Sequence, residues 1–289
     1  MKTATGKFPL GWRRRNFAWE QDGEGVIRWA KENDLEVIDL GRDTHTAAKP
    51  FIDAGLRIGT ADLVVWEAMI SPDAGKRKEA VAKNADYIQA CVKAGANVFF
   101  ICMLPEDKSR SRQENFGYMV ESYRALRPVF EENNAYLAIE GWPGPGSLVC
   151  TPETYRAFIE QVGSPNMGVN YDPSHLVRMG IDSIRFLREF VSHVFHVHGK
   201  DTMLIEENLY QYGNLQDPTF GVPYNYGGMN WRYTIPGHGL SDWKTILNML
   251  ADSGYKGCVS IELEDHFYND TEYDQKQGVL QGVKFLAGS

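Results

Sequence analysis

Short hydrophobic runs alternate with longer amphipathic segments along most of the chain. A short apolar run bounded by polar or turn-forming residues is typical of a buried strand, and apolar residues at steps of three and four indicate a helix. Residues 97–104 are apolar without alternation, as in a strand that is covered on both faces. We expect strands within residues 8–12, 35–40, 56–64, 97–104, 136–140, 167–172, 194–199 and 257–262, and helices at 23–33, 74–94, 112–132 and 241–253.

This alternation predicts a parallel sheet that is covered by helices. Eight expected strands with intervening helices, and no linker rich in Pro, Gly or Ser, favour an α/β fold: a single (β/α)₈ TIM barrel that spans residues 1–289 as one domain. The alternative is an open doubly wound sheet. Its dinucleotide-binding form carries a Gly-x-Gly-x-x-Gly turn after the first strand, and this sequence has none at that place.

One connection breaks the alternation. Residues 201–240, after the seventh expected strand, show little helical or strand periodicity. A loop of this length inside a compact domain is usually a lid or a binding loop. Flat aromatic faces with polar tips suit stacking on sugar rings, and they equally suit packing of the loop on itself or on a partner subunit. The aromatic residues of the segment are Tyr210, Tyr212, Phe220, Tyr224, Tyr226, Trp231 and Tyr233.

The charge, the cysteine spacing and the hydropathy of the chain disfavour several classes of protein. The formal net charge of −8 disfavours a general affinity for nucleic acid, and the short cationic run Arg13-Arg14-Arg15 is expected to be a surface turn or a substrate-side anchor. The four cysteines form no Cys-x-x-Cys pair, and Cys102 and Cys258 lie in apolar runs, so we expect buried free thiols. No apolar stretch is long enough for a membrane span and the N-terminus is polar, so we expect a cytoplasmic enzyme without membrane or nucleic-acid partners.

Acidic and imidazole side chains stand at the ends of four expected strands. They are Glu140 in Ala-Ile-Glu-Gly-Trp, Asp172 in Asn-Tyr-Asp-Pro, His198 in His-Val-His-Gly and Glu262 in Ser-Ile-Glu-Leu. In a (β/α)₈ barrel the carboxyl ends of the strands converge, so we expect these side chains to meet. Three carboxylates together are costly when buried without a cation. With one imidazole and no thiolate, the set suits one divalent metal ion: Mn²⁺, with Mg²⁺, Co²⁺ or Zn²⁺ as alternatives.

Other side chains near these strand ends are further candidates. Trp12 and Trp142 either line the pocket or pack in the core. Lys200 either binds an anionic group, acts as an acid or is solvated, and His238 on the long loop is a candidate substrate contact. His196 points to the same side of its strand as the ligand histidine two residues later, and we expect it to be structural or to support the ligand set.

Four motifs in the second half of the chain carry a family resemblance. They are Asp-Pro-Ser-His at 172–175, His-Val-His-Gly-Lys-Asp at 196–201, Pro-Gly-His-Gly-Leu-Ser-Asp-Trp at 236–243 and Ile-Glu-Leu-Glu-Asp at 261–265. The chain resembles the xylose-isomerase-like TIM-barrel superfamily. More narrowly, it is similar to the sugar phosphate isomerase/epimerase group that includes the ketose 3-epimerases.

The resemblance implies roles for individual residues. The same four residues would be the metal ligands, and the two ligand glutamates would also serve as the acid/base pair. His175 would lie beside the ligands or touch a substrate oxygen, and Arg232 would bind substrate hydroxyls. In the ketose 3-epimerases a further glutamate, six residues after the first, contacts the substrate. Gly146 stands at that position here, which leaves the ligand set intact and argues against a simple ketose substrate.

These observations predict a metal-dependent sugar isomerase or epimerase. We expect proton abstraction α to a carbonyl, through an enediolate that the metal stabilises, with Glu140 and Glu262 on opposite sides of a small carbohydrate. The alternative is a lyase that cleaves C- or O-glycosides of 3-keto sugars by β-elimination at the same site. An AP-endonuclease-like enzyme would need more histidines in the first half, where His45 alone precedes His175, and a non-catalytic metal-binding protein has no need of an open site. A homo-oligomer or a small partner subunit stays possible.

Overall fold

The structure is a computed structural model, and it describes residues 1–288. The chain divides into two compact units, each of which is described by itself. The first unit holds residues 1–38, 172–191 and 197–288, and the second holds residues 39–171 and 192–196. Strands β2 (Val37–Asp39) and β8 (Val194–Gly199) contribute residues to both units.

Parallel strands form the centre of the first unit. Here β1 (Leu10–Arg13) pairs with β11 (Val259–Ile261), and β11 pairs with the second half of β8. The register places Trp12 opposite Ile261 and His198 opposite Ser260. The helices of this unit are η1 (Ala18–Gln21), α1 (Gly23–Glu32), α6 (Pro173–Arg178), α7 (Ser183–Phe190), α8 (Glu206–Tyr212), α9 (Trp243–Asp252) and α10 (Glu272–Gly288).

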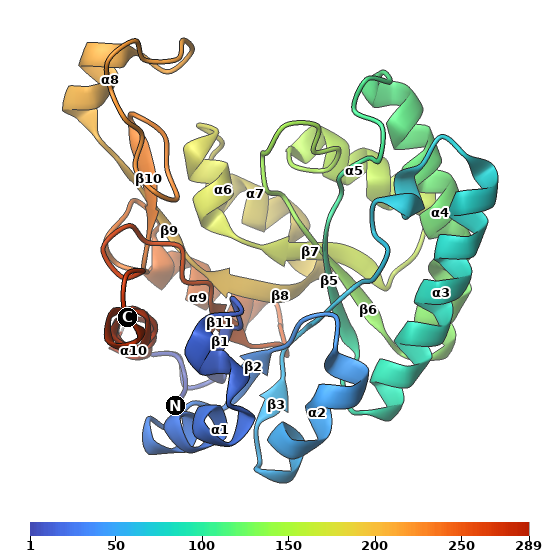
Figure 1. The fold of residues 1–289 in the computed structure, drawn as a ribbon, viewed down its shortest axis with the longest axis horizontal. Helices are drawn as coiled ribbons and strands as arrows, with labels where there is room; N and C mark the ends of the chain where they lie inside the picture. The colour runs from blue at the N-terminus through green and yellow to red at the C-terminus, as the bar shows by residue number, and fades with distance from the viewer. Residues whose placement is uncertain (289) are drawn as a thin grey trace. The chain divides into compact units, whose positions relative to one another are not determined.

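The second unit repeats the alternation of strand and helix. Parallel pairing joins β4 (Ala61–Asp62), β5 (Val98–Cys102), β6 (Tyr136–Glu140) and β7 (Met167–Tyr171) in this order. Figure 1 shows helices α3 and α4 side by side along these strands, and the two helices pack against each other. The unit also holds β3 (Arg57–Ile58), α2 (Thr44–Asp53), η2 (Ala68–Ile70), α3 (Ala74–Lys93), α4 (Arg112–Glu132) and α5 (Pro152–Val162), and η3 (Val191–His193) begins in the first unit and ends in this one.

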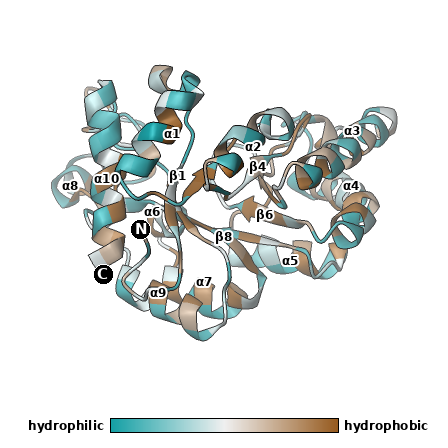
Figure 2. Ribbon diagram, turned by 90° about the horizontal axis from the view of Figure 1, so that it is seen from below, coloured by the Kyte–Doolittle hydropathy of each residue, from teal (hydrophilic) through white to brown (hydrophobic). Residues whose placement is uncertain are grey.

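The strands are apolar and buried, as the hydrophobic runs predict. Every residue of β7 is buried, and so are Leu137, Ala138 and Ile139 of β6, whereas Figure 2 shows α8 as hydrophilic. Burial of this kind contributes about 25 cal/mol per Å² of apolar surface and is the main term that stabilises the sheet. One expectation was inaccurate: residues 56–64 hold two separate short strands, β3 and β4, rather than one.

The segment 201–240 has more structure than its sequence suggests. It contains β9 (Asp201–Leu204), α8 and β10 (Trp231–Thr234), and β9 pairs with β10 in an antiparallel sheet of two strands. In Figure 1 the strands and α8 extend outward as an arm. Tyr210 and Phe220 of the arm are 83% and 94% exposed, whereas Tyr233 at its base is buried. The aromatic residues therefore range from exposed to half-buried to buried: Tyr210, Tyr212 and Phe220 are exposed, Tyr224, Tyr226 and Trp231 are half-buried, and Tyr233 is buried. Among residues 1–288, no helix is both long and apolar enough to cross a membrane.

Candidate functional site

Three of the four predicted ligands lie together in the first unit. Asp172 directly follows β7 and is the N-cap of α6, His198 lies in β8, and Glu262 directly follows β11. All three side chains are buried. Ser174 donates both its backbone N–H (2.9 Å) and its hydroxyl (2.6 Å) to Asp172 Oδ1. This cap fixes the carboxylate and directs its second oxygen, Oδ2, toward the other two residues.

The ligand-type atoms of these residues converge. His198 Nδ1 lies 3.4 Å from Glu262 Oε2 and 4.0 Å from Asp172 Oδ2. One donor atom from each of the three lies within 4.8 Å of the others. Two carboxylates and an imidazole at this spacing are a set that divalent cations accept. We call Asp172, His198 and Glu262 the ligand triad.

The Lys200 ammonium group bridges the two carboxylates of the triad. Its Nζ is 2.5 Å from Glu262 Oε2, 3.1 Å from Asp172 Oδ2 and 2.9 Å from Glu264 Oε2. The side chain is fully buried, and Nζ also lies 4.6 Å from the centre of the Tyr233 ring. A buried ammonium needs such partners because desolvation of an unpaired charge is expensive. The sequence left open whether this lysine is solvated, and the structure places it at the centre of the acidic group.

Two arginines from the end of β1 complete the cationic surroundings of Glu262. Arg13 Nε lies 3.3 Å and Arg15 Nη1 lies 3.2 Å from Glu262 Oε1, and Arg15 Nη2 lies 2.8 Å from Glu264 Oε1. Burial alone would raise the pKa of Glu262, but Lys200, His198 and Arg15 outweigh it and hold this pKa well below its usual range. Glu262 is therefore a carboxylate at neutral pH. The cationic run contacts the site rather than forming a surface turn.

His175 supports the triad from α6. Its Nδ1 lies 2.6 Å from the Tyr233 hydroxyl, and its Nε2 lies 3.4 Å from both Asp172 Oδ2 and Lys200 Nζ. Arg178 donates to the same hydroxyl at 3.0 Å and stacks on Trp231, with its Cζ 4.0 Å from the ring centre. Burial raises the pKa of Tyr233, so this hydroxyl stays protonated at neutral pH. The sequence assigned Tyr233 to the long loop and gave no signal for this contact.

The remaining predicted residues of the first unit lie in different surroundings. Trp12 is buried, and its Nε1 donates to Glu20 Oε1 at 3.1 Å. Arg232 is buried and donates to Asp265 Oδ1 at 3.1 Å. His238 is exposed in the turn after β10. Asp265 lies three residues after Glu262 in the same motif, so Arg232 forms its ion pair next to the strand end that carries Glu262.

Glu140 belongs to the second unit, where it ends β6 and is buried. Its Oε2 accepts a hydrogen bond from Asn170 Nδ2 at 2.7 Å, so β7 orients this carboxylate. Trp142, two residues later, is half-buried, and its ring lies against Gly144, where any Cβ would clash. His196 Nε2 lies 2.9 Å from Asp39 Oδ2, both buried, which gives this histidine a carboxylate partner of its own in the second unit.

The residues of the triad fit a divalent cation. Asp172 Oδ2 is buried and accepts no hydrogen bond within residues 1–288, although the Lys200 ammonium lies 3.1 Å away. The ammonium is the positive charge that faces this oxygen. Oxygen and imidazole donors without a thiolate do not select one metal, because several divalent cations accept them.

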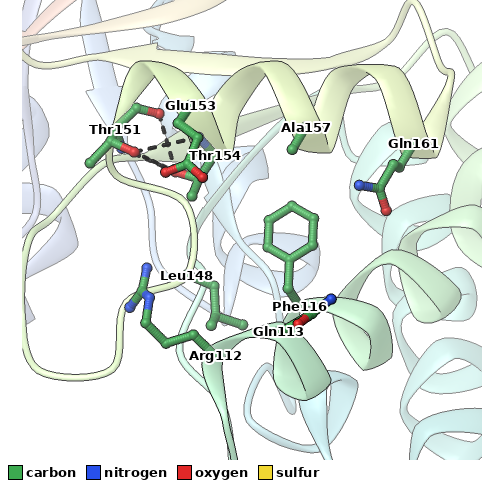
Figure 3. Close-up of a pocket in the computed structure, with 9 residues that line it drawn as sticks. All are labelled: Arg112, Gln113, Phe116, Leu148, Thr151, Glu153, Thr154, Ala157 and Gln161. Atoms are coloured by element: carbon green, nitrogen blue, oxygen red, sulfur yellow. Dashed lines mark hydrogen bonds between the residues drawn. The ribbon is translucent and has the colours of Figure 1, made fainter.

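A separate pocket of about 490 Å³ lies in the second unit between α4 and α5 (Figure 3). Arg112, Phe116 and Thr154 lie on its walls, and no residue that the sequence predicted for the site lines it. Arg112 donates to Ser147 O at 2.6 Å, which ties its guanidinium to the backbone. Among the described residues that line the pocket, no group of acidic and histidine side chains could hold a metal and no ion pair spans the pocket. The candidate catalytic residues are therefore those at the strand ends.

Comparison with known proteins defines the family. A family model of xylose isomerase-like TIM barrels matches residues 8–288, so the chain belongs to this family. The match confirms both the fold class and the family that the sequence predicted. Among solved structures, a D-psicose 3-epimerase from Clostridium cellulolyticum H10 is 17% identical with a TM-score of 0.70, over 96% of this chain and 97% of the other. The IOLI protein with a bound zinc atom is 18% identical with a TM-score of 0.66, over 96% of both chains.

Two curated relatives match part of the chain. An inosose dehydratase of Clostridium tetani is 28% identical over 159 residues, which is 55% of this chain and 50% of the relative. The Bacillus subtilis protein YfiH is 39% identical over 120 residues, which is 41% of this chain and 37% of the relative. The chain therefore spans half or less of the length of these relatives. The proteins that resemble this chain thus include a sugar epimerase and an inosose dehydratase.

Proposed function

We propose that the chain is a divalent-metal-dependent enzyme that removes a proton α to the carbonyl of a carbohydrate and thereby isomerises or epimerises it. The observation that carries this proposal is the convergence of buried donor atoms from Asp172, His198 and Glu262 within 4.8 Å of one another. The family and the neighbouring sugar epimerase support it. In this proposal the whole chain acts as one catalytic domain.

The metal would be held by the triad, with Glu140 as the fourth ligand. We include Glu140 because of its position in the sequence: it ends the strand that precedes β7, and the barrel of this family brings the strand ends to one face. We assign Mn²⁺ first, and the zinc of the IOLI protein makes Zn²⁺ the first alternative. A bound divalent cation would polarise the carbonyl of the substrate and stabilise the negative charge that grows after proton loss.

The side chains around the triad have separate tasks in this proposal. Glu140 and Glu262 form the acid/base pair, one on each side of the substrate. Glu262 is ionised at neutral pH because cations surround it, so it is ready to accept a proton rather than to donate one. His175, held by the Tyr233 hydroxyl, would contact a substrate oxygen. Arg232, His238, Trp12 and Trp142 are the further substrate contacts proposed from the sequence. Lys200, also a candidate from the sequence, contacts the carboxylates of Asp172 and Glu262.

A second candidate function is a lyase reaction at the same site. The specific observation that favours it is the 28% identity to an inosose dehydratase, because the epimerases resemble the chain at lower identity. Elimination begins with the same loss of a proton next to a ketone. It differs in the second step, where a hydroxyl or glycosidic oxygen at the β carbon leaves. Gly146, which replaces the glutamate of the ketose 3-epimerases, and the arm of residues 201–240 suit a substrate other than a free ketose.

Proton exchange in D₂O tests both candidates. The Mn²⁺-loaded protein is incubated with free ketoses, ketose phosphates, 3-keto-glycosides and inososes and followed by NMR. Deuterium next to the carbonyl together with a new epimer or isomer supports the first function. Deuterium with release of water or an aglycone supports the lyase. A metal-loaded protein that exchanges no proton on any member contradicts the proposal of α-proton chemistry for these substrate classes.

Glu262→Gln is the decisive variant for the residue assignment. The amide keeps the volume of the side chain and removes the base, so we expect a folded protein without exchange. Glu32→Gln, at an exposed position at the end of α1, is the matched control and should exchange like the wild type. Exchange at the wild-type rate in Glu262→Gln excludes Glu262 as an essential base.

A further inference from the structure

Lys200 lies between the two carboxylates of the ligand triad. Its ammonium contacts one oxygen each of Asp172 and Glu262, at 3.1 and 2.5 Å, and these are the two oxygens that face His198. The lysine side chain is fully buried, so its charge is balanced by these carboxylates and not by water. A divalent cation bound to the same oxygens would stand next to the ammonium, and the repulsion between two cations in a poorly solvated site is large.

We propose that Lys200 is an exchangeable internal counter-cation: its ammonium holds Asp172 and Glu262 together when no metal is bound, and it leaves them when a divalent cation binds. This inference rests on the proposed metal site. It makes the lysine a positioning residue of that site, because it acts through the ligands.

Glu264 offers the ammonium a second position. Its Oε2 lies 2.9 Å from Lys200 Nζ, and its Oε1 lies 2.8 Å from Arg15 Nη2. The carboxylate is more exposed than those of the triad, at 16% against 1% for Asp172 and 4% for Glu262. A small rotation of the lysine side chain about this contact would release the triad and keep the charge paired. The face of the Tyr233 ring, 4.6 Å away, also favours a cation on this side.

The exchange has a measurable consequence for metal affinity. The free energy of metal binding to the wild type includes the cost of separating the ammonium from the two carboxylates. Lys200→Met removes this cost and keeps most of the side-chain volume. Groups in direct contact usually couple by factors between about 2 and 100. We therefore expect Lys200→Met to bind Mn²⁺ about tenfold more tightly than the wild type, as measured by electron paramagnetic resonance or calorimetry.

The metal-free variant should behave in the opposite way. Without the ammonium, Asp172 and Glu262 repel each other, so the melting temperature of metal-free Lys200→Met should fall by about 5 °C or more. Saturating Mn²⁺ should restore it. Lys276→Met is the matched control, because this lysine pairs with Glu272 on α10, and it should leave the affinity for Mn²⁺ unchanged. Should Lys200→Met fail to fold, Lys200→Gln serves in its place.

Glu264→Gln tests the second position of the ammonium directly. Loss of this carboxylate leaves Lys200 without its alternative partner, so metal binding should weaken in the single variant. In the double variant with Lys200→Met, the Glu264 substitution should have little effect. Equal or weaker Mn²⁺ affinity in Lys200→Met than in the wild type overturns the inference, and the metal site then stands without it. Absence of Mn²⁺ and Zn²⁺ binding in both proteins overturns the metal site and the inference together.

Discussion

Arg15 Nη1 lies 3.2 Å from Glu262 Oε1, although the two residues are 247 positions apart in the chain. Parallel pairing of β1 with β11, with Trp12 opposite Ile261, brings the ends of both strands to the same level. The guanidinium also reaches Glu264. Burial alone would lower the pKa of Arg15, but Glu264 and Glu262 outweigh it and raise this pKa above its usual value. The contact therefore couples the first strand to the residue that we propose as both ligand and base.

Arg15→Met should destabilise the protein in a pH-dependent way. Arg15 is 23% exposed, and Arg13 and Lys200 remain on Glu262, so we expect about 1–2 kcal/mol, less than the roughly 3–5 kcal/mol for a fully buried pair. The depressed pKa of Glu262 contributes stability that is present above its ordinary value of 4.5 and is lost as pH falls through its folded value. The deficit of the variant should therefore be largest near pH 7 and shrink in acid.

Urea unfolding of wild type and variant at pH 7 and at a pH below the folded pKa of Glu262 measures this difference. Arg28→Met, at an exposed position of α1, is the control and should show no pH-dependent deficit. A deficit of the same size at both pH values would show that Arg15 acts through packing of its side chain and not through the charge of Glu262.

The sequence predicts an element or a contact well when the residues that determine it are close together in the chain. The helix at 112–132 and the strands at 136–140 and 194–199 have the predicted bounds, because caps and apolar periodicity are local properties. The cationic contacts of Glu262 depend on strand pairing between the two ends of the chain. The adjacency of first and last strand in a barrel was the one available signal for Arg13 and Arg15. The position of Lys200 depends on its burial. The sequence does not indicate this burial, because a lysine that follows a strand is usually solvated.

Thr151→Ala tests the N-terminal cap of α5. Thr151 is the N-cap of α5, with Pro152 at the first helical position, and its hydroxyl accepts from Thr154 N at 3.4 Å. Loss of a threonine cap usually costs about 1 kcal/mol. We expect a loss of this size in the free energy of unfolding, and Thr151→Ser should recover most of it. An unchanged stability in the alanine variant would mean that Thr154, which also donates to Thr151 O, satisfies the helix start alone.

Gly11→Ala should be strongly destabilising, because the backbone of β1 approaches β2 closely at this residue. A Cβ on Gly11 would lie 1.8 Å from the carbonyl oxygen of Val37. Since backbone cannot move aside like a side-chain end, we expect a cost of about 3 kcal/mol, at the upper end of overpacking. Gly117→Ala in α4 meets no atom within 4 Å and should instead stabilise the protein by roughly 0.5–1 kcal/mol. The melting temperatures of both variants, measured by thermal unfolding, test this difference in stability. Similar melting temperatures would contradict the predicted clash.

The cysteines should differ in reactivity. None of the four forms a disulfide within residues 1–288, and Cys102 is only half-buried, which corrects the expectation that it is as buried as Cys258. Burial raises the pKa of Cys91 to about 11, so its thiolate fraction at pH 8 is very small. A thiol reagent at pH 8 should modify Cys102 first and reach Cys91 only after unfolding. Peptide mapping identifies the order, and early labelling of Cys91 would show that its surroundings open in solution.

Tyr233→Phe separates the support of His175 from the metal ligands. The change removes the hydroxyl that lies 2.6 Å from His175 Nδ1 and leaves the ring that faces Lys200. Groups that orient residues of a metal site typically change activity by about 10- to 100-fold when removed. We expect proton exchange in D₂O to slow by roughly tenfold, with an unchanged affinity for Mn²⁺, because Tyr233 contacts no residue of the triad through its hydroxyl. Tyr273→Phe, at an exposed position of α10, is the control and should exchange at the wild-type rate. A parallel loss of Mn²⁺ affinity would instead place Tyr233 in the support of the metal ligands.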